Sequence, residues 1–188
     1  RGTVEPGESR LQLNDVSCSS DRGTPGLRGV SLEVFSGEIL GIAGVSGNGQ
    51  RELAESITGL RKITSGHVIL EGQDVTGSAP GELTERMLSY IPEERMRDGM
   101  IKNFSVAENM ILREHHKEPC SRSGFLNLRE ISHHSDELIK KLQVKTPSRD
   151  TPAKNLSGSN IQKVVLAREL SRIPRVVVAA QPTRGLDV

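Results

Sequence analysis

Aromatic residues are scarce in this sequence. Its 188 residues include three Phe, one Tyr and no Trp. Proteins that bind single-stranded nucleic acid stack the bases on aromatic rings, so this class of function is disfavoured. The formal net charge is only +1, which argues against a strong overall attraction to nucleic acid or to lipid. We therefore expect no nucleic-acid partner.

Cysteine and long apolar runs are also nearly missing. Cys18 and Cys120 lie far apart and match no metal-binding spacing, which indicates two inert thiols in a reducing compartment. No apolar run approaches the roughly 20 residues of a membrane-spanning helix, and no signal-peptide pattern opens the sequence. With 34% hydrophobic and 26% charged residues, the composition is typical of a soluble protein.

The hydrophobic pattern predicts an α/β fold. The predicted strands are residues 11–16, 30–35, 39–43, 66–75, 88–91 and 176–180. Those at 39–43 and 176–180 are continuous apolar runs, which predicts burial on both faces. The predicted helices are residues 52–58, 105–116, 129–144 and 160–172, the last of them amphipathic.

The composition along the chain predicts a single domain made of four stretches. The first ten residues are polar and rich in Gly and Pro, which is typical of a linker. The character becomes helical after residue 93. We expect a linker at 1–10, a β layer with a phosphate-loop core at 11–92, a helical subdomain at 93–155 and a closing helix and strand at 156–188.

A glycine-rich loop, GVSGNGQR at residues 44–51, lies between a predicted strand and a predicted helix. This is the context of a phosphate-binding loop, whose backbone N–H groups and following helix N-terminus hold phosphates. The pattern G-x-x-x-x-G-K-[S/T] requires Lys and then Ser or Thr, whereas this chain has Gln50 and Arg51. The candidate nucleotide-binding residues are Gly44, Val45, Ser46, Gly47, Asn48, Gly49, Gln50, Arg51 and Glu93.

Several further motifs follow in a fixed order. They are YIPEER at 90–95, SVAEN at 105–109, LSGSN at 156–160, VVVAAQPT at 176–183 and RGLD at 184–187. With the glycine loop, they make the chain resemble the nucleotide-binding domain of ATP-binding cassette (ABC) transporters over nearly its whole length. Within that family the chain resembles the second, degenerate cassette of simple-sugar and nucleoside importers. The resemblance implies an ABC-type P-loop NTPase core with an N-terminal antiparallel β subdomain and a helical subdomain.

The resemblance also implies that this cassette has lost its own catalytic residues. The metal-binding Asp of the family falls at Ala180, the catalytic Glu at Gln181 and the magnesium-sensing Gln at Glu93. The segment after the first strand offers no aromatic residue for adenine stacking. We expect weak ATP binding, doubtful Mg²⁺ binding and a poor or inactive ATPase, because no intact general base or metal ligand is present.

Arg51 admits two interpretations. It can form an ion pair with Glu93 that fills the vacated metal site with a fixed cation. The other interpretation is a solvated helix residue, with Glu93 paired to Arg95 or Arg97. The basic cluster RMRDG at 95–99 is likewise either a contact for the membrane partner, as the family implies, or an ordinary solvated turn.

The signature segment is better preserved than the glycine loop. In ABC dimers the signature of one cassette faces the ATP held by the glycine loop of the other. The candidate signature residues are Leu156, Ser157, Gly158, Ser159 and Asn160, and the D-loop residues near the same site are Gly185, Leu186 and Asp187. Ser159 replaces the second glycine of the usual pattern. The alternative is that residues 156–160 only start a helix.

The resemblance implies a cytoplasmic protein on the inner face of the cytoplasmic membrane. Its partners would be a second ABC cassette on the same or another chain, transmembrane permease subunits and, indirectly, a substrate-binding protein. The alternative function is a non-catalytic structural or dimerisation module that binds no nucleotide. Because no histidine follows His134, the family's switch histidine is missing, and we expect a C-terminally truncated cassette with one unfinished sheet edge.

Overall fold

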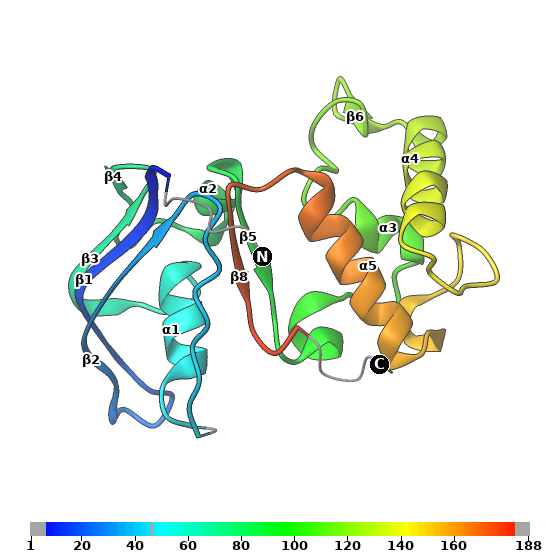
Figure 1. Ribbon diagram of the computed structural model, residues 1–188. Helices are drawn as coiled ribbons and strands as arrows, with labels where there is room; N and C mark the ends of the chain where they lie inside the picture. Colours follow the sequence, from blue (N-terminus) through cyan, green and yellow to red (C-terminus); the bar gives the residue numbers. More distant parts are fainter. Residues whose placement is uncertain (1–6, 46, 183–188) are drawn as a thin grey trace. The chain divides into compact units, whose positions relative to one another are not determined.

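The chain forms two compact units, which Figure 1 shows in a computed structural model that describes residues 7–45 and 47–182. The first unit comprises residues 1–89 and 175–180, and the second comprises residues 90–174 and 181–188. Within the described ranges, no helix has both the length and the hydropathy that a membrane span requires. The second unit extends beyond the predicted helical subdomain, because it includes the helix that follows residue 156.

A four-stranded antiparallel sheet dominates the first unit, with strand order β2-β1-β3-β4. The strands are β1 (Ser9–Ser19), β2 (Pro25–Phe35), β3 (Ile63–Leu70) and β4 (Gln73–Asp74). Leu11 and Leu13 of β1 are buried in alternation, and after a register shift the buried positions continue at Val16 and Cys18. This one-sided burial explains why period-two alternation predicted the strands at 11–16 and 30–35, which the structure confirms.

The remaining elements of the first unit complete its core. They are α1 (Gln50–Ile57), α2 (Pro80–Glu85), the start of β5 (Leu88–Ile91) and β8 (Val176–Ala179), with β5 and β8 paired in a two-stranded sheet. The predicted helix end at Gly59 is confirmed, because α1 stops at Ile57 and Gly59 has φ +72°. Leu53 and Ile57 of α1 join Leu13 and Leu70 of the sheet in one apolar cluster.

Three strand predictions need correction. The range 66–75 is not one strand, because β3 ends at Leu70 and β4 covers only Gln73–Asp74 after a turn. Residues 39–43 form no strand, and the side chains there are exposed, with Ile39 at 96% and Ile42 at 55%. A strand needs hydrogen-bonding neighbours, and in the described part of the chain no strand pairs with this run. The strand at 176–180 is present as β8 but is not fully buried, because Val177 is 41% exposed while Val176 is buried.

The second unit is helical. Its elements are the end of β5, η1 (Arg95–Gly99, a π-helix), α3 (Val106–Met110), β6 (Ser121–Arg122), β7 (Phe125–Leu126), α4 (Leu128–Lys141), η2 (Ala153–Asn155, a 3-10 helix) and α5 (Gly158–Ser171). The predicted helix at 105–116 is shorter than expected. A capping box between Ser105 and Glu108 starts α3, which ends at Met110 and continues as turns.

Helix α5 differs from the amphipathic helix predicted for 160–172. Its apolar residues Val164 and Val165 are fully buried, but Gln162, Arg168 and Glu169 are also buried. Arg168 Nε donates to Glu169 Oε1 at 2.9 Å, and its NH1 donates to the carbonyl of Gly99 at 2.8 Å. Polar side chains can be buried here because they are hydrogen-bonded to one another and to the backbone of neighbouring segments.

Candidate functional site

The glycine loop leads into α1, but residues 39–43 before it form no strand, so only the turn into the helix is present from the predicted strand–loop–helix context. Gly47 and Gly49 have φ values of +86° and +99°, in the left-handed region that favours glycine. Gly49 is also the N-cap of α1, and a Cβ added there would lie 2.9 Å from the carbonyl oxygen of Gly26. The sequence keeps these glycines because the turn into α1 needs them, whether or not a phosphate binds.

The Gln50 side chain folds back into this loop. Its Nε2 donates to the carbonyl oxygen of Val45 at 3.0 Å, and its Oε1 accepts from the backbone N–H of Asn48 at 3.2 Å. A Cβ added at Gly44 would collide with the Gln50 amide nitrogen. The amide therefore occupies the inside of the loop and uses a backbone N–H that a phosphate oxygen would otherwise accept from.

Arg51 belongs to a surface ionic cluster of the first unit. Its Nε donates to Glu55 at 2.7 Å, and its NH1 lies 3.4 Å from Asp21. Arg61 also contacts both carboxylates, each at 2.6 Å. Burial lowers the pKa of Arg61, and its bonds to Asp21 and Glu55 outweigh this and raise the pKa. Glu93 belongs to the other unit, so the Arg51–Glu93 pair stays one of two hypotheses, beside that of a solvated Arg51.

The strand-end positions carry no acid. Ala180 directly follows β8, and Gln181 has φ +49°, a left-handed conformation that is uncommon for a residue with a side chain. The carbonyl oxygen of Pro182 accepts from Nε2 of the buried Gln162 at 3.0 Å, which ties this turn to α5. An alanine and an amide supply neither a charged metal ligand nor a general base, so the donor set does not fit a Mg²⁺ ion bound for ATP cleavage.

The signature residues form a compact polar group at the start of α5. The hydroxyls of Ser157 and Ser159 lie 3.2 Å apart, and Asn160 Nδ2 donates to Ser157 Oγ at 2.8 Å. Asn160 is buried and accepts from the N–H of Lys145 at 2.7 Å, which fixes the segment to the end of the α4 region. Ser157, Gly158 and Ser159 remain accessible beside the free N–H groups of a 14-residue helix.

Gly158 sits in open space, since a Cβ added there would meet no heavy atom of the described chain within 4 Å. The φ of Gly158 is not in the left-handed region either, so the backbone of this chain does not require glycine at this position. Leu156 is half-buried and packs beside the apolar cluster of the second unit. The predicted D-loop residues Gly185, Leu186 and Asp187, like Ser46 of the glycine loop, lie outside the described residues.

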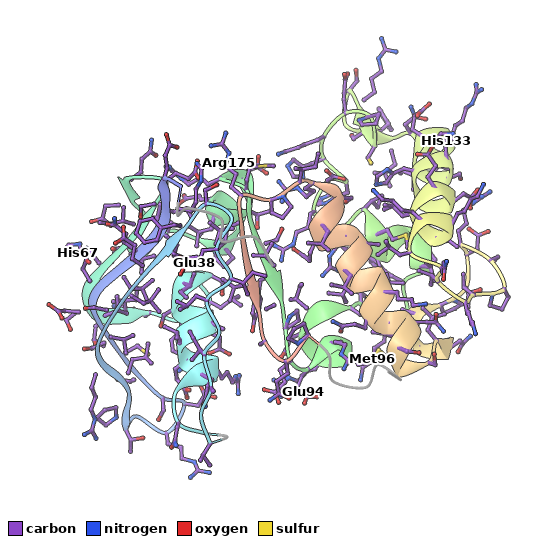
Figure 2. All side chains as sticks on the ribbon, viewed as in Figure 1. Glu38, His67, Glu94, Met96, His133 and Arg175 are labelled. Atoms are coloured by element: carbon purple, nitrogen blue, oxygen red, sulfur yellow. The ribbon has the colours of Figure 1, made fainter. Side chains whose placement is uncertain are left out.

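The structure adds one contact to the signature that the sequence did not indicate. Arg95, in the basic cluster that folds as η1, donates from NH1 to the carbonyl oxygen of Gly158 at 3.1 Å. Figure 2 labels Met96 of η1, which lies near the start of α5, and Glu94, which directly precedes η1. Arg97 bonds its neighbour Asp98 instead, through two contacts of 2.8 Å. Nothing in the sequence around Arg95 indicates that its side chain bonds to Gly158, which lies far away along the chain.

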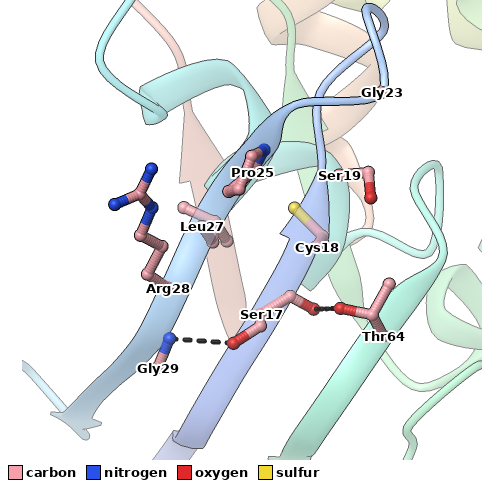
Figure 3. A pocket seen from close by; sticks show the side chains of 9 residues that line it. All are labelled: Ser17, Cys18, Ser19, Gly23, Pro25, Leu27, Arg28, Gly29 and Thr64. Atoms are coloured by element: carbon pink, nitrogen blue, oxygen red, sulfur yellow. Dashed lines mark hydrogen bonds between the residues drawn. The ribbon is translucent and has the colours of Figure 1, made fainter.

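A shallow cavity of about 380 Å³ opens between β1, β2 and β3 of the first unit (Figure 3). It is lined by Ser17, Cys18, Ser19, Gly23, Pro25, Leu27, Arg28, Gly29 and Thr64. Ser17 Oγ already accepts from the N–H of Gly29 at 2.9 Å, and Thr64 donates to the Ser17 carbonyl at 3.0 Å. None of the nine lining residues has an aromatic ring, so the cavity offers no platform for stacking a base.

Comparison with known proteins decides which family these motifs represent. A family model described as ABC transporter matches residues 27–184. The chain belongs to the ABC transporter family. This confirms the resemblance of the motifs to an ABC nucleotide-binding domain and the ABC-type P-loop NTPase fold.

Two relatives of this ABC domain are ATP-binding proteins of importers. The chain is 40% identical over 188 residues to the nucleoside import ATP-binding protein NupA of Lactococcus lactis subsp. cremoris, covering 100% of this chain and 37% of NupA. It is 42% identical over 185 residues to the guanosine import ATP-binding protein NupO of Bacillus subtilis, covering 98% of this chain and 36% of NupO. The chain thus spans just over a third of the length of these relatives.

Solved ABC cassettes share the fold. The ATP-binding cassette MJ0796 in a dimeric post-hydrolysis state, bound to ADP and Pi, superposes with a TM-score of 0.78 at 26% identity, covering 94% of this chain and 76% of that one. A nucleotide-free ABC transporter cassette superposes with a TM-score of 0.73 at 24% identity, covering 95% and 71% of the two chains. The fold is therefore common to nucleotide-bound and nucleotide-free cassettes.

Proposed function

We propose that this domain is the second, degenerate cassette of an importer for a simple sugar or nucleoside. In this proposal it cannot use ATP at its own glycine loop and donates its signature segment to the ATP of a partner cassette. The observation that carries the proposal is the Gln50 amide, which occupies the loop and accepts from the N–H of Asn48 at 3.2 Å. An intact loop would place a lysine ammonium there.

Apart from backbone N–H groups, the nucleotide site of this domain lacks the groups that phosphoryl transfer needs. Gln50 offers no charge to the terminal phosphates, and Arg51 offers a cation where a magnesium-binding hydroxyl is expected. Ala180 and Gln181 add no carboxylate. When bound, a Mg²⁺–ATP complex would bring the charge-neutralising metal, but these residues supply nothing to hold it or to activate water. We therefore expect weak ATP binding and no cleavage at this loop.

The signature segment, by contrast, can face a phosphate of the ATP that a partner cassette holds. The accessible Ser157 and Ser159 hydroxyls lie 3.2 Å apart beside the N-terminus of α5. Helix N-termini and hydroxyls donate hydrogen bonds to phosphate oxygens, and the helix dipole favours negative charge. The open space at Gly158 supports a contact with a partner, because the packing of this chain does not require glycine there.

The relatives support the wider assignment. NupA and NupO are importer ATP-binding proteins for nucleosides and guanosine, and a 41% identical relative from Haloferax volcanii is a glucose import ATP-binding protein. Nucleosides are the substrate we favour. The domain would act on the cytoplasmic face of the membrane, with transmembrane permease subunits and, indirectly, a substrate-binding protein. The partner cassette would lie on the same or a separate chain.

The competing function is a structural or dimerisation module that binds no nucleotide. Titration of labelled ATP, with and without Mg²⁺, separates the two. Saturable weak binding supports a degenerate cassette. Complete absence of binding, even at millimolar ATP, supports the structural module, because backbone N–H groups alone give an intact loop residual affinity for phosphate.

The donation of the signature is tested in the assembled transporter. Gly158→Asp places a carboxylate where the partner's phosphate would approach, so we expect ATP turnover to fall by roughly a hundredfold. Gly81→Asp is the matched control, since Gly81 also lies in the first turn of a helix, α2, with no atom within 4 Å of an added Cβ. Equal turnover in both variants would contradict donation.

A further inference from the structure

The hairpin of β6 and β7 carries a group of large apolar side chains that the fold does not cover. Phe125 is 80% exposed, Leu126 is 52% exposed and Leu128, at the start of α4, is 70% exposed. The register pairs Ser121 with Leu126 and Arg122 with Phe125. Figure 1 shows the β6 hairpin projecting at one end of the second unit, next to the first turn of α4.

Two arginines flank this apolar group. Arg122 on β6 and Arg129 in the first turn of α4 are both exposed. Neither guanidinium takes part in an ion pair or hydrogen bond within the described ranges 7–45 and 47–182. We call Arg122, Phe125, Leu126, Leu128 and Arg129 the hairpin tip.

The base of the hairpin is held firmly, so the tip is a built feature of the fold. Cys120 is 2% exposed and packs with Ala107, Ile111 and Ile131 in a small apolar cluster. The carbonyl of Cys120 accepts from the N–H of Asn127 at 2.8 Å. The Asn127 side chain in turn caps α4. With its base fixed in this way, the hairpin cannot turn its apolar side chains inward.

The turn between β6 and β7 also favours a hairpin that projects from the second unit. Ser123 and Gly124 have φ values of +51° and +82°, the left-handed pair of a two-residue hairpin turn. Such a turn is tight and convex. A stable protein interface buries about 800 Å² on each partner, more than a few side chains on a two-residue hairpin supply. A lipid surface sets no such requirement, because single apolar side chains can enter it one by one.

We propose that the hairpin tip binds the surface of a bilayer that contains anionic phospholipid. Phe125, Leu126 and Leu128 would enter the boundary between headgroups and acyl chains, and Arg122 and Arg129 would contact the phosphates. The chain's overall charge of +1 gives no long-range attraction, so binding depends on this local arrangement. The proposal goes beyond attachment through permease subunits and does not depend on the state of the nucleotide site.

The test is co-sedimentation of the purified protein with vesicles of phosphatidylcholine alone or mixed with phosphatidylglycerol. We expect binding to the mixed vesicles. Phe125→Ser with Leu126→Ser should lower the vesicle affinity by at least about tenfold. Arg122→Gln with Arg129→Gln should lower the affinity for mixed vesicles by roughly 25-fold, since each basic residue near an anionic surface contributes about fivefold.

Ile173→Ser is the matched control. Ile173 is 82% exposed and belongs to the same unit but not to the hairpin, so its loss should leave binding unchanged. Circular dichroism confirms that each variant keeps its helix content. The proposal is overturned if the unaltered protein does not bind mixed vesicles, or if the Phe125 and Leu126 changes leave binding intact. Binding only when permease subunits are present also overturns it and assigns the tip to a protein partner.

Discussion

Gln50 shows how one side chain decides what the glycine loop can do. A lysine ammonium in this position carries a full charge to a triphosphate, whereas the Gln50 amide is neutral and already bonded to Val45 and Asn48. A nucleotide that enters the loop must first displace these two hydrogen bonds. The glycines shape the turn into α1, and we expect the glutamine to lower the affinity of the loop for ATP.

Gln50→Lys should restore binding without restoring catalysis. A charge-assisted hydrogen bond is worth about 1.5–3 kcal/mol, which corresponds to roughly a tenfold to hundredfold rise in ATP affinity. Hydrolysis should stay undetectable because Gln181 has no carboxylate. Titration with labelled ATP measures the first effect and phosphate release the second. Gln12→Lys on β1 adds the same charge elsewhere and should not raise affinity.

The buried pair Arg168 and Glu169 is a second case in which single residues matter. Glu169 is 1% exposed, and its carboxylate also forms an ion pair with Arg113 at 3.3 Å. Burial lowers the pKa of Arg168, and the adjacent Glu169 carboxylate opposes this shift. The pair holds α5, which carries the candidate signature residues, against the backbone at Gly99.

Glu169→Leu should lower the free energy of unfolding by about 3–5 kcal/mol, because it leaves the buried Arg168 charge without its partner. Urea unfolding followed by circular dichroism measures the change. The double variant Arg168→Met with Glu169→Leu removes both charges and should recover most of the loss. If the double variant is as unstable as the single one, lost packing rather than an unpaired charge is responsible.

At the scale of elements, the β3–β4 hairpin contains an exposed carboxylate that is held by hydrogen bonds. Thr76 donates to Asp74 from its backbone N–H at 2.9 Å, and His67 contacts Asp74 at 2.8 Å. Figure 2 shows His67 pointing outward from the first unit. Hydrogen bonds from the side chain and backbone of Thr76, followed by that from His67, lower the pKa of Asp74 from 3.8 to about 2.

The direction of this pKa shift determines how the stability of the fold depends on pH. A lowered pKa in the folded state means that ionised Asp74 stabilises the fold above about pH 4 and that this contribution is lost as the pH falls toward about 2. Asp74→Asn should therefore be less stable than the unaltered protein at neutral pH, and the difference should shrink below pH 4. Urea unfolding across this range measures it. A difference that stays constant down to pH 2 would contradict the assignment.

Elements could be predicted from the sequence wherever local signals agree. Alternation predicted β1 and β2, the glycine at 59 predicted the end of α1, and the helix expected at 129–144 is present as α4. The run at 39–43 failed because an apolar composition indicates burial only if other strands cover it. Helix α5 was predicted to be one-sided, and its buried polar residues depend on partners far away in sequence.

At the scale of the whole molecule, the two units have separate apolar clusters. Leu13 and Leu70 belong to the first, and Met110 and Val164 belong to the second. The match to solved ABC cassettes, with a TM-score of 0.78, covers both units. Each cluster is therefore expected to control the local stability of its own elements.

Leu70→Ala and Met110→Ala should have local effects on hydrogen exchange. Each deletion of a fully buried side chain costs about 2–5 kcal/mol, so exchange should speed up by at least about thirtyfold. We expect faster exchange in β1 and β3 for Leu70→Ala, and in α3 and α5 for Met110→Ala. Mass spectrometry of the exchanged peptides measures it. Equal acceleration throughout the chain for both variants would show a single cooperative unit instead.

The sequence by itself determined the family, because the order of the motifs and the residue types in them are local properties. It also determined that Gln50, Ala180 and Gln181 carry no charge. Only the tertiary structure decided that the Gln50 amide turns into its own loop, that Arg95 reaches the Gly158 carbonyl and that the hairpin tip is left exposed. These features depend on which distant backbone groups and side chains come within contact distance, and composition and spacing do not encode that directly.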